Sequence, residues 1–222
     1  MKTIVKRVLT AFCMLSLFSI ASVQAQDDKN SEVGIKGGLN FSNFYSDEVD
    51  DQNMRMSFHA GMYFKAALNH FLAIQPELLY SRKGSTTKYD NFITGEGEFS
   101  NNLDYLELPV LGVFNLTENI NVHAGPYFAY LLNAEIQNES ENSDFNFVED
   151  LNEDDFERLD YGIAAGLGFE FETMRFGVRY NYGLTEVGKS QGFTLNGSEY
   201  QSDQFKNLRN SSLSIYLGLR LN

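Results

Sequence analysis

The stretch RFGVRYNY at residues 175–182 alternates without interruption between apolar and polar or small residues. The apolar side chains that would share one face of an extended chain are Phe176, Val178, Tyr180 and Tyr182. The opposite face would hold Arg175, Gly177, Arg179 and Asn181. Period-two alternation is typical of a β-strand that lies between an apolar and a polar environment. This stretch therefore predicts a two-faced strand.

Seven other stretches repeat this pattern, and each spans roughly ten to thirteen residues, close to the 9–11 of a tilted membrane-spanning strand. Their apolar positions run from Val33 to Phe41, Phe58 to Leu68, Leu72 to Tyr80, Leu106 to Phe114, Ile120 to Tyr130, Tyr161 to Phe171 and Leu213 to Leu219. Short connections (69–70, 115–119 and about 172–173) alternate with long ones (43–55, 82–102, 133–159 and 185–211). Bacterial outer-membrane barrels place short turns in the periplasm and long loops outside. The sequence predicts an all-β, eight-stranded, antiparallel up-and-down transmembrane barrel.

The N-terminus has the features of a secretory signal peptide. Lys2, Lys6 and Arg7 precede an apolar run at 8–20, and the segment ends on small residues at Ala25. The run is too short for a transmembrane helix, which needs about 20 residues. We expect a signal peptide at 1–25 and a barrel domain at 26–222. The only cysteine, Cys13, would leave with the signal peptide, so the mature chain would have no disulfide.

The chain is acidic, with a formal net charge of −13. This charge argues against nucleic acid as a partner, because nucleic acid is itself a polyanion. Residues 135–160 contain eleven carboxylates and one cation, Arg158. The segment at 149–155 is rich in oxygen ligands but lacks the spacing of a calcium loop. We expect neither a metal nor a cofactor.

Alternation alone leaves two orientations open, because a soluble lipocalin-like barrel buries its apolar face inside. Glycine favours the membrane barrel. The polar face of the predicted strands has Gly34, Gly38, Gly61, Gly125, Gly162, Gly166, Gly168, Gly177, Gly183 and Gly218, whereas the apolar face has Gly37 and Gly112. A narrow lumen filled by side chains needs small residues among large ones. We therefore expect the polar face inside and the apolar face against lipid.

Charged residues on the polar face would meet inside such a barrel. The predicted lumenal charges are Lys36, Lys65, Glu77, Glu107, Glu170, Arg175, Arg179 and Arg220, together with Glu32. Buried charges must be paired. An ion-pair network that closes the barrel is one interpretation, and a selective conduction path or gate is the other. Eight strands leave no open channel, which favours the closed network.

Several motifs resemble the PorT-like outer-membrane β-barrel family: GIKGGLN at 34–40, IQPELLYS at 74–81, LELP at 106–109, AGPY at 124–127 and GVRY at 177–180. The resemblance implies a small barrel in the outer membrane of a Gram-negative cell. The family's namesake is tied to protein secretion, a role we do not transfer. The motifs include Pro76, Pro109 and Pro126, each of which removes a donor from a predicted strand. We expect local β-bulges at these prolines.

No catalytic motif stands out in the sequence. Ser57 and His59 share a face, but a lone Ser-x-His is a weak signal, since triads are recognised by geometry. His123 is the other histidine expected to face the lumen. We expect a non-enzymatic structural or surface-binding scaffold that acts through long acidic external loops. A lipid-modifying enzyme and a narrow solute channel are the alternatives. Expected partners are outer-membrane lipids, the barrel-assembly machinery and an unidentified surface ligand.

Overall fold

The structure is a computed structural model of the chain. It describes residues 31–45, 53–91, 95–140, 147–150, 157–187, 193–195, 198–200 and 208–222. The strands in these ranges are β1 (Ser31–Tyr45), β2 (Asn53–Ala67), β3 (Leu72–Asn91), β4 (Gly95–Asn115), β5 (Ile120–Ser140), β6 (Phe147–Asp150), β7 (Leu159–Glu170), β8 (Met174–Glu186), β9 (Phe193–Leu195), β10 (Ser198–Tyr200) and β11 (Arg209–Arg220). None of the described residues forms a helix long and apolar enough to cross a membrane. The expected signal peptide, residues 1–25, lies outside the described residues.

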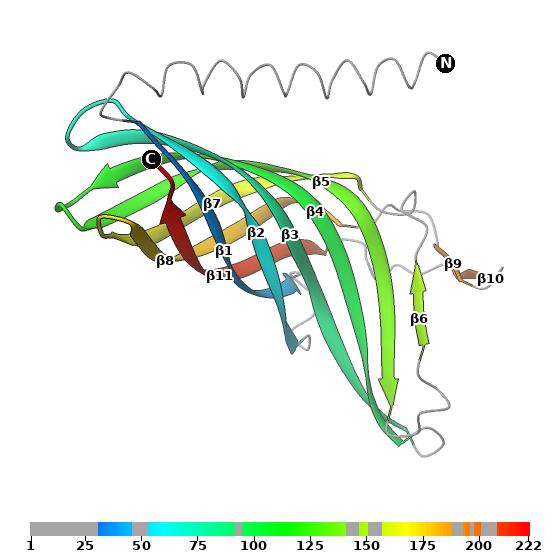
Figure 1. Cartoon of the computed structure of the whole chain (residues 1–222). Coiled ribbons are helices and arrows are strands. Elements are labelled where there is room, and N and C mark those ends of the chain that lie inside the picture. Colours follow the sequence, from blue (N-terminus) through cyan, green and yellow to red (C-terminus); the bar gives the residue numbers. More distant parts are fainter. Residues whose placement is uncertain are drawn as a thin grey trace, which may run out of the picture.

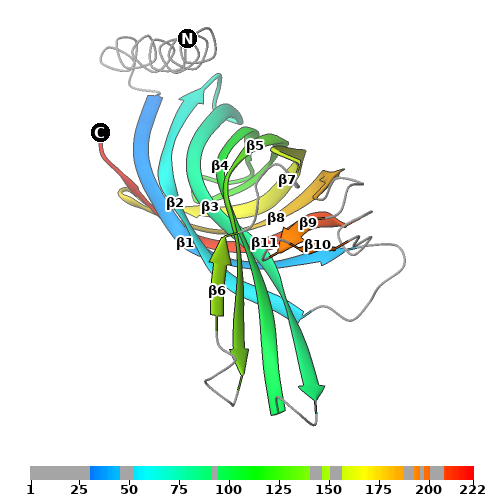
Figure 2. The same cartoon turned by 90° about the vertical axis from the view of Figure 1, so that its right-hand side faces the viewer.

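In the described part of the chain, eight antiparallel strands close into a barrel (Figures 1 and 2). Their order around the wall is β1, β2, β3, β4, β5, β7, β8 and β11, and β11 pairs with β1 to close the ring. The short strand β6 pairs with β5, and β9 and β10 form a separate two-stranded sheet. This arrangement confirms the predicted eight-stranded up-and-down barrel.

The two ends of the barrel differ. The connections at 68–71, 116–119 and 171–173 are short and lie at the same end as Ser31 and Asn222, which we call the turn end. The Asn69 side-chain oxygen accepts hydrogen bonds from the backbone of Phe71 and Leu72, both at 2.9 Å. The first turn therefore has four residues, where the sequence predicted two. The opposite end, which we call the loop end, has the long connections.

The two faces of the wall confirm the polar-inside orientation. Along β8, every second side chain from Arg175 to Gly183 is buried and those between them are exposed. Val178 is 40% exposed, whereas its neighbour Arg179 is 3% exposed. The other wall strands also present large apolar side chains outward. The lipocalin-like alternative, with apolar residues inside, is thereby excluded.

Lumenal glycines make room for large polar side chains. A Cβ on Gly168 would lie 2.7 Å from the side-chain oxygen of Asn121, and one on Gly166 would lie 2.7 Å from Nε2 of His123. Gly112, on the outer face, would have its nearest neighbour at 3.6 Å. The lumen is therefore filled at these positions, as the glycine pattern predicted.

The expected bulges at the prolines are wrong. Pro76 pairs with Val110 and Pro109 with Tyr127, and the register on either side of each is unchanged. Some backbone pairs are missing beside these prolines, but the register does not change. A proline removes one hydrogen-bond donor and still leaves the chain extended. The register shifts lie elsewhere: between Met54 and His59, between Asp104 and Tyr105, and between Arg209 and Ser211.

Strands β3, β4 and β5 run past the rest of the wall at the loop end (Figures 1 and 2). They have 20, 21 and 21 residues, whereas β7 and β11 have 12 each. We call residues 87–91, 95–102 and 131–140, together with β6, the ribbon. The predicted loops at 82–102 and 133–159 are therefore wrong in large part. The strands continue there because their backbones remain paired, although the apolar alternation has ended.

Candidate functional site

Ionisable side chains from all parts of the wall meet in the lumen in three groups. The mouth cluster lies nearest the turn end and comprises Glu32, Lys65, Glu170, Arg175 and Arg220. The central cluster comprises Lys36, Glu77 and Arg179. The loop-end cluster comprises Lys83, Glu107 and Asp160. All eight charged residues that the sequence predicted for the lumen belong to these groups, and one of them, Arg220, lies at the rim.

The central cluster is built around Glu77 of β3. Its carboxylate accepts hydrogen bonds from Lys36 Nζ at 3.0 and 3.2 Å and from the two terminal nitrogens of Arg179, both at 2.8 Å. Gln75 donates a further bond at 2.7 Å. Lys36 Nζ also lies 3.6 Å from the centre of the Tyr216 ring. The buried carboxylate therefore has a donor for each of its oxygens. The cluster joins the three strands β1, β3 and β8, and the contact with Tyr216 extends it to β11.

The mouth cluster is partly open to solvent. Lys65 Nζ lies 2.7 Å from Glu170, which also accepts a bond from Asn121 at 2.8 Å. Arg175 pairs with Glu32 and donates to the hydroxyl of Tyr63 at 2.9 Å. The side chain of Arg220 is 35% exposed and lies 3.5 Å from Glu32. Arg220 therefore lies at the rim and not deep in the lumen.

A neutral polar layer separates the central and loop-end clusters. Asn40 Oδ1 lies 2.8 Å from Nδ1 of His59 and accepts a bond from Ser214 at 2.8 Å. The hydroxyl of Ser57 donates to the backbone oxygen of Arg82 at 2.6 Å. Ser57 and His59 therefore each form hydrogen bonds with other residues of the wall, as expected for polar side chains that fill the lumen. His123 lies on the turn-end side of this layer, where its Nε2 is 3.3 Å from Nε of Arg179.

Two members of the loop-end cluster, Lys83 and Asp160, were not predicted from the sequence. Lys83 Nζ lies 2.7 Å from Glu107 and 3.7 Å from Asp160, and all three side chains are buried. Lys83 also lies 4.5 Å from the centre of the Tyr127 ring. Lys83 fell in a predicted loop and Asp160 one residue before a predicted strand. Extending the alternation of β3 from Glu77 through Ser81 would have found the lysine.

Above this cluster, apolar side chains occupy the loop end of the lumen. They are Phe44, Leu103, Leu131, Ala134, Val187 and Leu208, and each is nearly fully buried. Backbone hydrogen bonds join Glu157 to Val187 and Val187 to Leu208, both continuing the wall. The described lumen is therefore sealed at this end by a hydrophobic layer and crossed below it by ion pairs.

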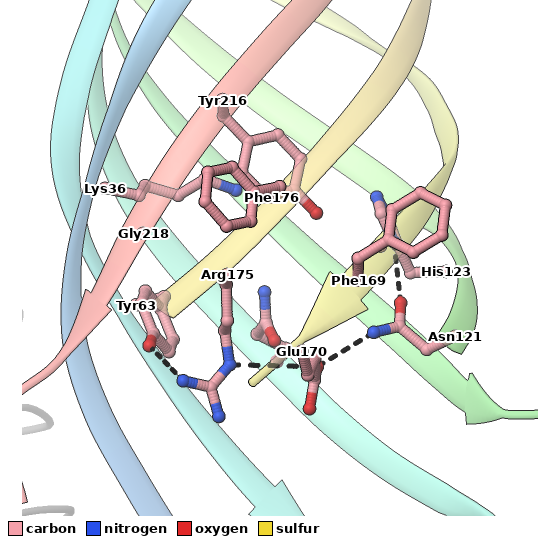
Figure 3. Close-up of a pocket in the computed structure, with 12 residues that line it drawn as sticks. Lys36, Tyr63, Asn121, His123, Phe169, Glu170, Arg175, Phe176, Tyr216 and Gly218 are labelled. Carbon is pink, nitrogen blue, oxygen red and sulfur yellow. Dashed lines mark hydrogen bonds and ion pairs between the residues drawn. The ribbon is translucent and has the colours of Figure 1, made fainter. Parts of the chain in front are cut away.

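A small pocket lies between the central and mouth clusters (Figure 3). Its volume is about 10 Å³, which is room for roughly one water molecule. Lys36 and Tyr216 line it toward one end, and Tyr63, Arg175 and Glu170 line it toward the other. A space of this size is a site for an atom or small ion and is not a conduction path.

The ribbon has the opposite chemistry to the lumen. Its sequence has one cation, Lys88, and seven carboxylates. The backbone register pairs three sets of acidic positions across the strands: Asp90 with Glu96, Glu98 with Glu139, and Glu135 with Asp150. On its other side, Glu98 is paired with Lys88. Like charges that face each other across strands are destabilising. In the described residues, no group of three or more His, Cys, Asp or Glu side chains is arranged to hold a metal ion.

Solved structures that resemble the chain include the attachment invasion locus protein Ail of Yersinia pestis, with 12% identity, a TM-score of 0.44, and coverage of 86% of this chain and 99% of that one. Neisserial surface protein A has 10% identity, a TM-score of 0.43, and coverage of 87% and 100%. OprG from Pseudomonas aeruginosa has 12% identity, a TM-score of 0.38, and coverage of 89% and 99%. No curated protein matches the sequence.

A family model shows to which protein family the chain belongs. The model described as "Outer membrane protein beta-barrel domain" matches residues 24–188, well over half of the chain. The matched range includes Lys36, Glu77 and Arg179 of the central cluster and all of the ribbon. The closed wall with its outward apolar face is the architecture that such a family requires. The chain therefore belongs to the outer membrane protein β-barrel domain family and is a small barrel of the outer membrane.

Proposed function

We propose that this barrel is a non-enzymatic scaffold whose ribbon binds a cationic partner at the cell surface. The observation that supports this most is the backbone register of the ribbon, which pairs six of its seven carboxylate positions with another carboxylate position, whereas its one cation, Lys88, is paired with Glu98 alone. Each such pair opposes strand pairing by about 0.2–1 kcal/mol. A bound cationic segment would relieve this repulsion, so binding and ribbon stability would reinforce each other.

The filled lumen favours a scaffold function rather than a channel function. Glu77 and Glu107 are buried and paired with cations, and hydrophobic side chains seal the loop end above them. A rigid frame that presents a protruding segment is the common arrangement for binding proteins. In outer-membrane barrels the long connections face the exterior. We therefore assign the loop end, with the ribbon, to the outside of the cell.

We also propose the route by which the chain reaches this position. The sequence features at residues 1–25 support export followed by cleavage after Ala25, and insertion by the barrel-assembly machinery would follow. The motifs at 34–40 and 74–81 support membership of the PorT-like branch of the family. A role in protein secretion is not part of the proposal.

A charge-matched pair of variants tests the proposal. Glu98→Gln with Glu135→Gln removes two carboxylates from the ribbon, whereas Glu118→Gln with Glu172→Gln removes two exposed carboxylates at the turn end. The probe is a fluorescent lysine-rich peptide added to protein in detergent micelles, and the measurement is its dissociation constant at low and high salt. We expect several-fold weaker binding for the ribbon variant alone. Equal binding by the two variants would overturn the ribbon as the site.

A further inference from the structure

Arg175 presents an unused donor to the pocket between the central and mouth clusters. Its guanidinium is 7% exposed, and its terminal nitrogens contact Glu32 and Tyr63. Its Nε is buried and makes no hydrogen bond. The Glu170 oxygen that forms an ion pair with it is 3.8 Å away, too far for a hydrogen bond. A buried donor without an acceptor is unfavourable, so this nitrogen favours a ligand in the pocket.

Lys36 approaches the same pocket from the central cluster (Figure 3). Its ammonium group shares the carboxylate of Glu77 with Arg179, so two cations divide one negative charge. An ammonium has three donors, and two of them are directed at Glu77. The tyrosines Tyr63 and Tyr216, which also line the pocket, bring hydroxyl groups that can donate as well.

The charge balance around the pocket is positive. Leaving aside the half-exposed Arg220, the central and mouth clusters combine four cations with three carboxylates. The cations are Lys36, Lys65, Arg175 and Arg179, and the carboxylates are Glu32, Glu77 and Glu170. The loop-end cluster has the opposite imbalance, but it lies beyond the neutral layer of Asn40 and His59. Buried charge in a low-dielectric interior needs a nearby counter-charge.

We propose that this pocket binds a single small inorganic anion of the size of chloride. The volume of about 10 Å³ is room for one small ion or one water molecule. A metal cation would be repelled by Lys36 and Arg175. Water would satisfy the donor on Arg175 but would leave the positive charge uncompensated. The anion would lie between the two clusters and connect them.

Halide substitution tests this site in the purified protein in detergent micelles. Crystals grown in sodium bromide should show an anomalous peak in the pocket. The thermal unfolding temperature should rise when gluconate is replaced by chloride or bromide at constant ionic strength, because gluconate is too large to enter. An ordered water without anomalous signal, together with equal unfolding temperatures in halide and gluconate, would overturn the proposal.

Two arginine variants separate the site from general salt effects. Arg175→Gln removes the donor from the pocket and should abolish the halide-dependent shift. Arg220→Gln removes a charge from the same mouth cluster without touching the pocket lining, and it should keep the shift. If Arg175→Gln fails to fold, the halide series on the unmodified protein still decides. A shift that persists unchanged in folded Arg175→Gln would contradict the site.

Discussion

The lumen and the ribbon hold acidic residues in opposite ways. In the lumen, Glu77 is surrounded by Lys36, Arg179 and Gln75, and no part of its side chain is exposed. In the ribbon, Glu135 and Asp150 occupy directly paired positions on neighbouring strands. Burial makes an unpaired charge prohibitive, whereas solvent and salt weaken the repulsion between exposed charges. Folding therefore constrains the charged residues of the lumen more strongly than those of the ribbon.

The largest effect should come from Glu77→Ala. The change leaves Lys36 and Arg179 buried without their carboxylate, and breaking a buried pair in this way costs about 3–5 kcal/mol. Urea unfolding in micelles measures the loss as a lowered midpoint. The ribbon control, Glu98→Ala, should stay within about 0.5 kcal/mol of the unmodified protein. Comparable losses in both variants would mean that lumen and ribbon do not differ as described.

Glu107→Ala tests whether Asp160 alone can compensate for the buried charge of Lys83. Lys83 loses its 2.7 Å contact but keeps Asp160 at 3.7 Å, so its charge is still partly compensated. We expect a loss of about 1–3 kcal/mol, smaller than that of Glu77→Ala. The same urea series measures it. A larger loss for Glu107→Ala than for Glu77→Ala would show that Asp160 does not compensate for the lysine.

Arginine on the outer face should act through lipid and not through pairing. Val178 and Leu217 point outward from the middle of β8 and β11 and are 40% and 41% exposed. Val178→Arg and Leu217→Arg should each cost about 2–4 kcal/mol if they lie near the bilayer midplane. Leu184→Arg, closer to the loop end of β8, is the depth control and should cost about 0–1 kcal/mol. Reversible unfolding in lipid vesicles measures all three, and tolerance of arginine at both central positions would refute lipid contact there.

The wall of the barrel could be predicted from the sequence because the membrane imposes two different environments on its faces. Alternation located each wall strand and, through these strands, the eight predicted charges from Lys36 to Arg220, but it did not locate Lys83 or Asp160. Above the membrane this constraint ends. The segment from Ser85 to Asn102 is mostly polar, and its few apolar residues, Tyr89, Phe92, Ile93 and Phe99, do not alternate regularly with polar ones. The pairing of acidic positions in the ribbon depends on the register between neighbouring strands. Without an apolar alternation, that register cannot be inferred from a single sequence.

The loop-end cluster shows the same limit on a smaller scale. Lys83 continues the inward series of β3, but the apolar outward series stops at Tyr80 and Arg82 takes the next outward position. Arg82 is tolerated there because Asp104 on the neighbouring strand accepts two hydrogen bonds from it, at 2.6 and 2.9 Å. A charged outward residue resembles the start of a loop in sequence, and only the cross-strand partner shows that the strand continues.

The smallest predicted effect concerns Glu135→Gln in the ribbon, and its sign is opposite to the losses in the lumen. Glu135 stands opposite Asp150 across the β5–β6 pair, so neutralising it removes a repulsion. Glutamine keeps a side-chain oxygen that can still accept the bond from Asn102, now at 3.2 Å. The β5–β6 pairing should gain about 0.2–1 kcal/mol. Amide hydrogen exchange at residues 135–138 should slow by a factor of about 1.4–5 if local opening governs exchange.

Salt distinguishes this electrostatic gain from a change in packing. At 1 M salt the screening length falls to about 3 Å, so the repulsion between Glu135 and Asp150 should already be weak in the unmodified protein. The exchange rates of the two proteins should then converge, mainly because exchange in the unmodified protein becomes slower at high salt. A difference that persists at 1 M salt, or faster exchange in Glu135→Gln at low salt, would mean that the facing carboxylates do not oppose strand pairing. In that case the ribbon would hold no electrostatic free energy for a cationic partner to release.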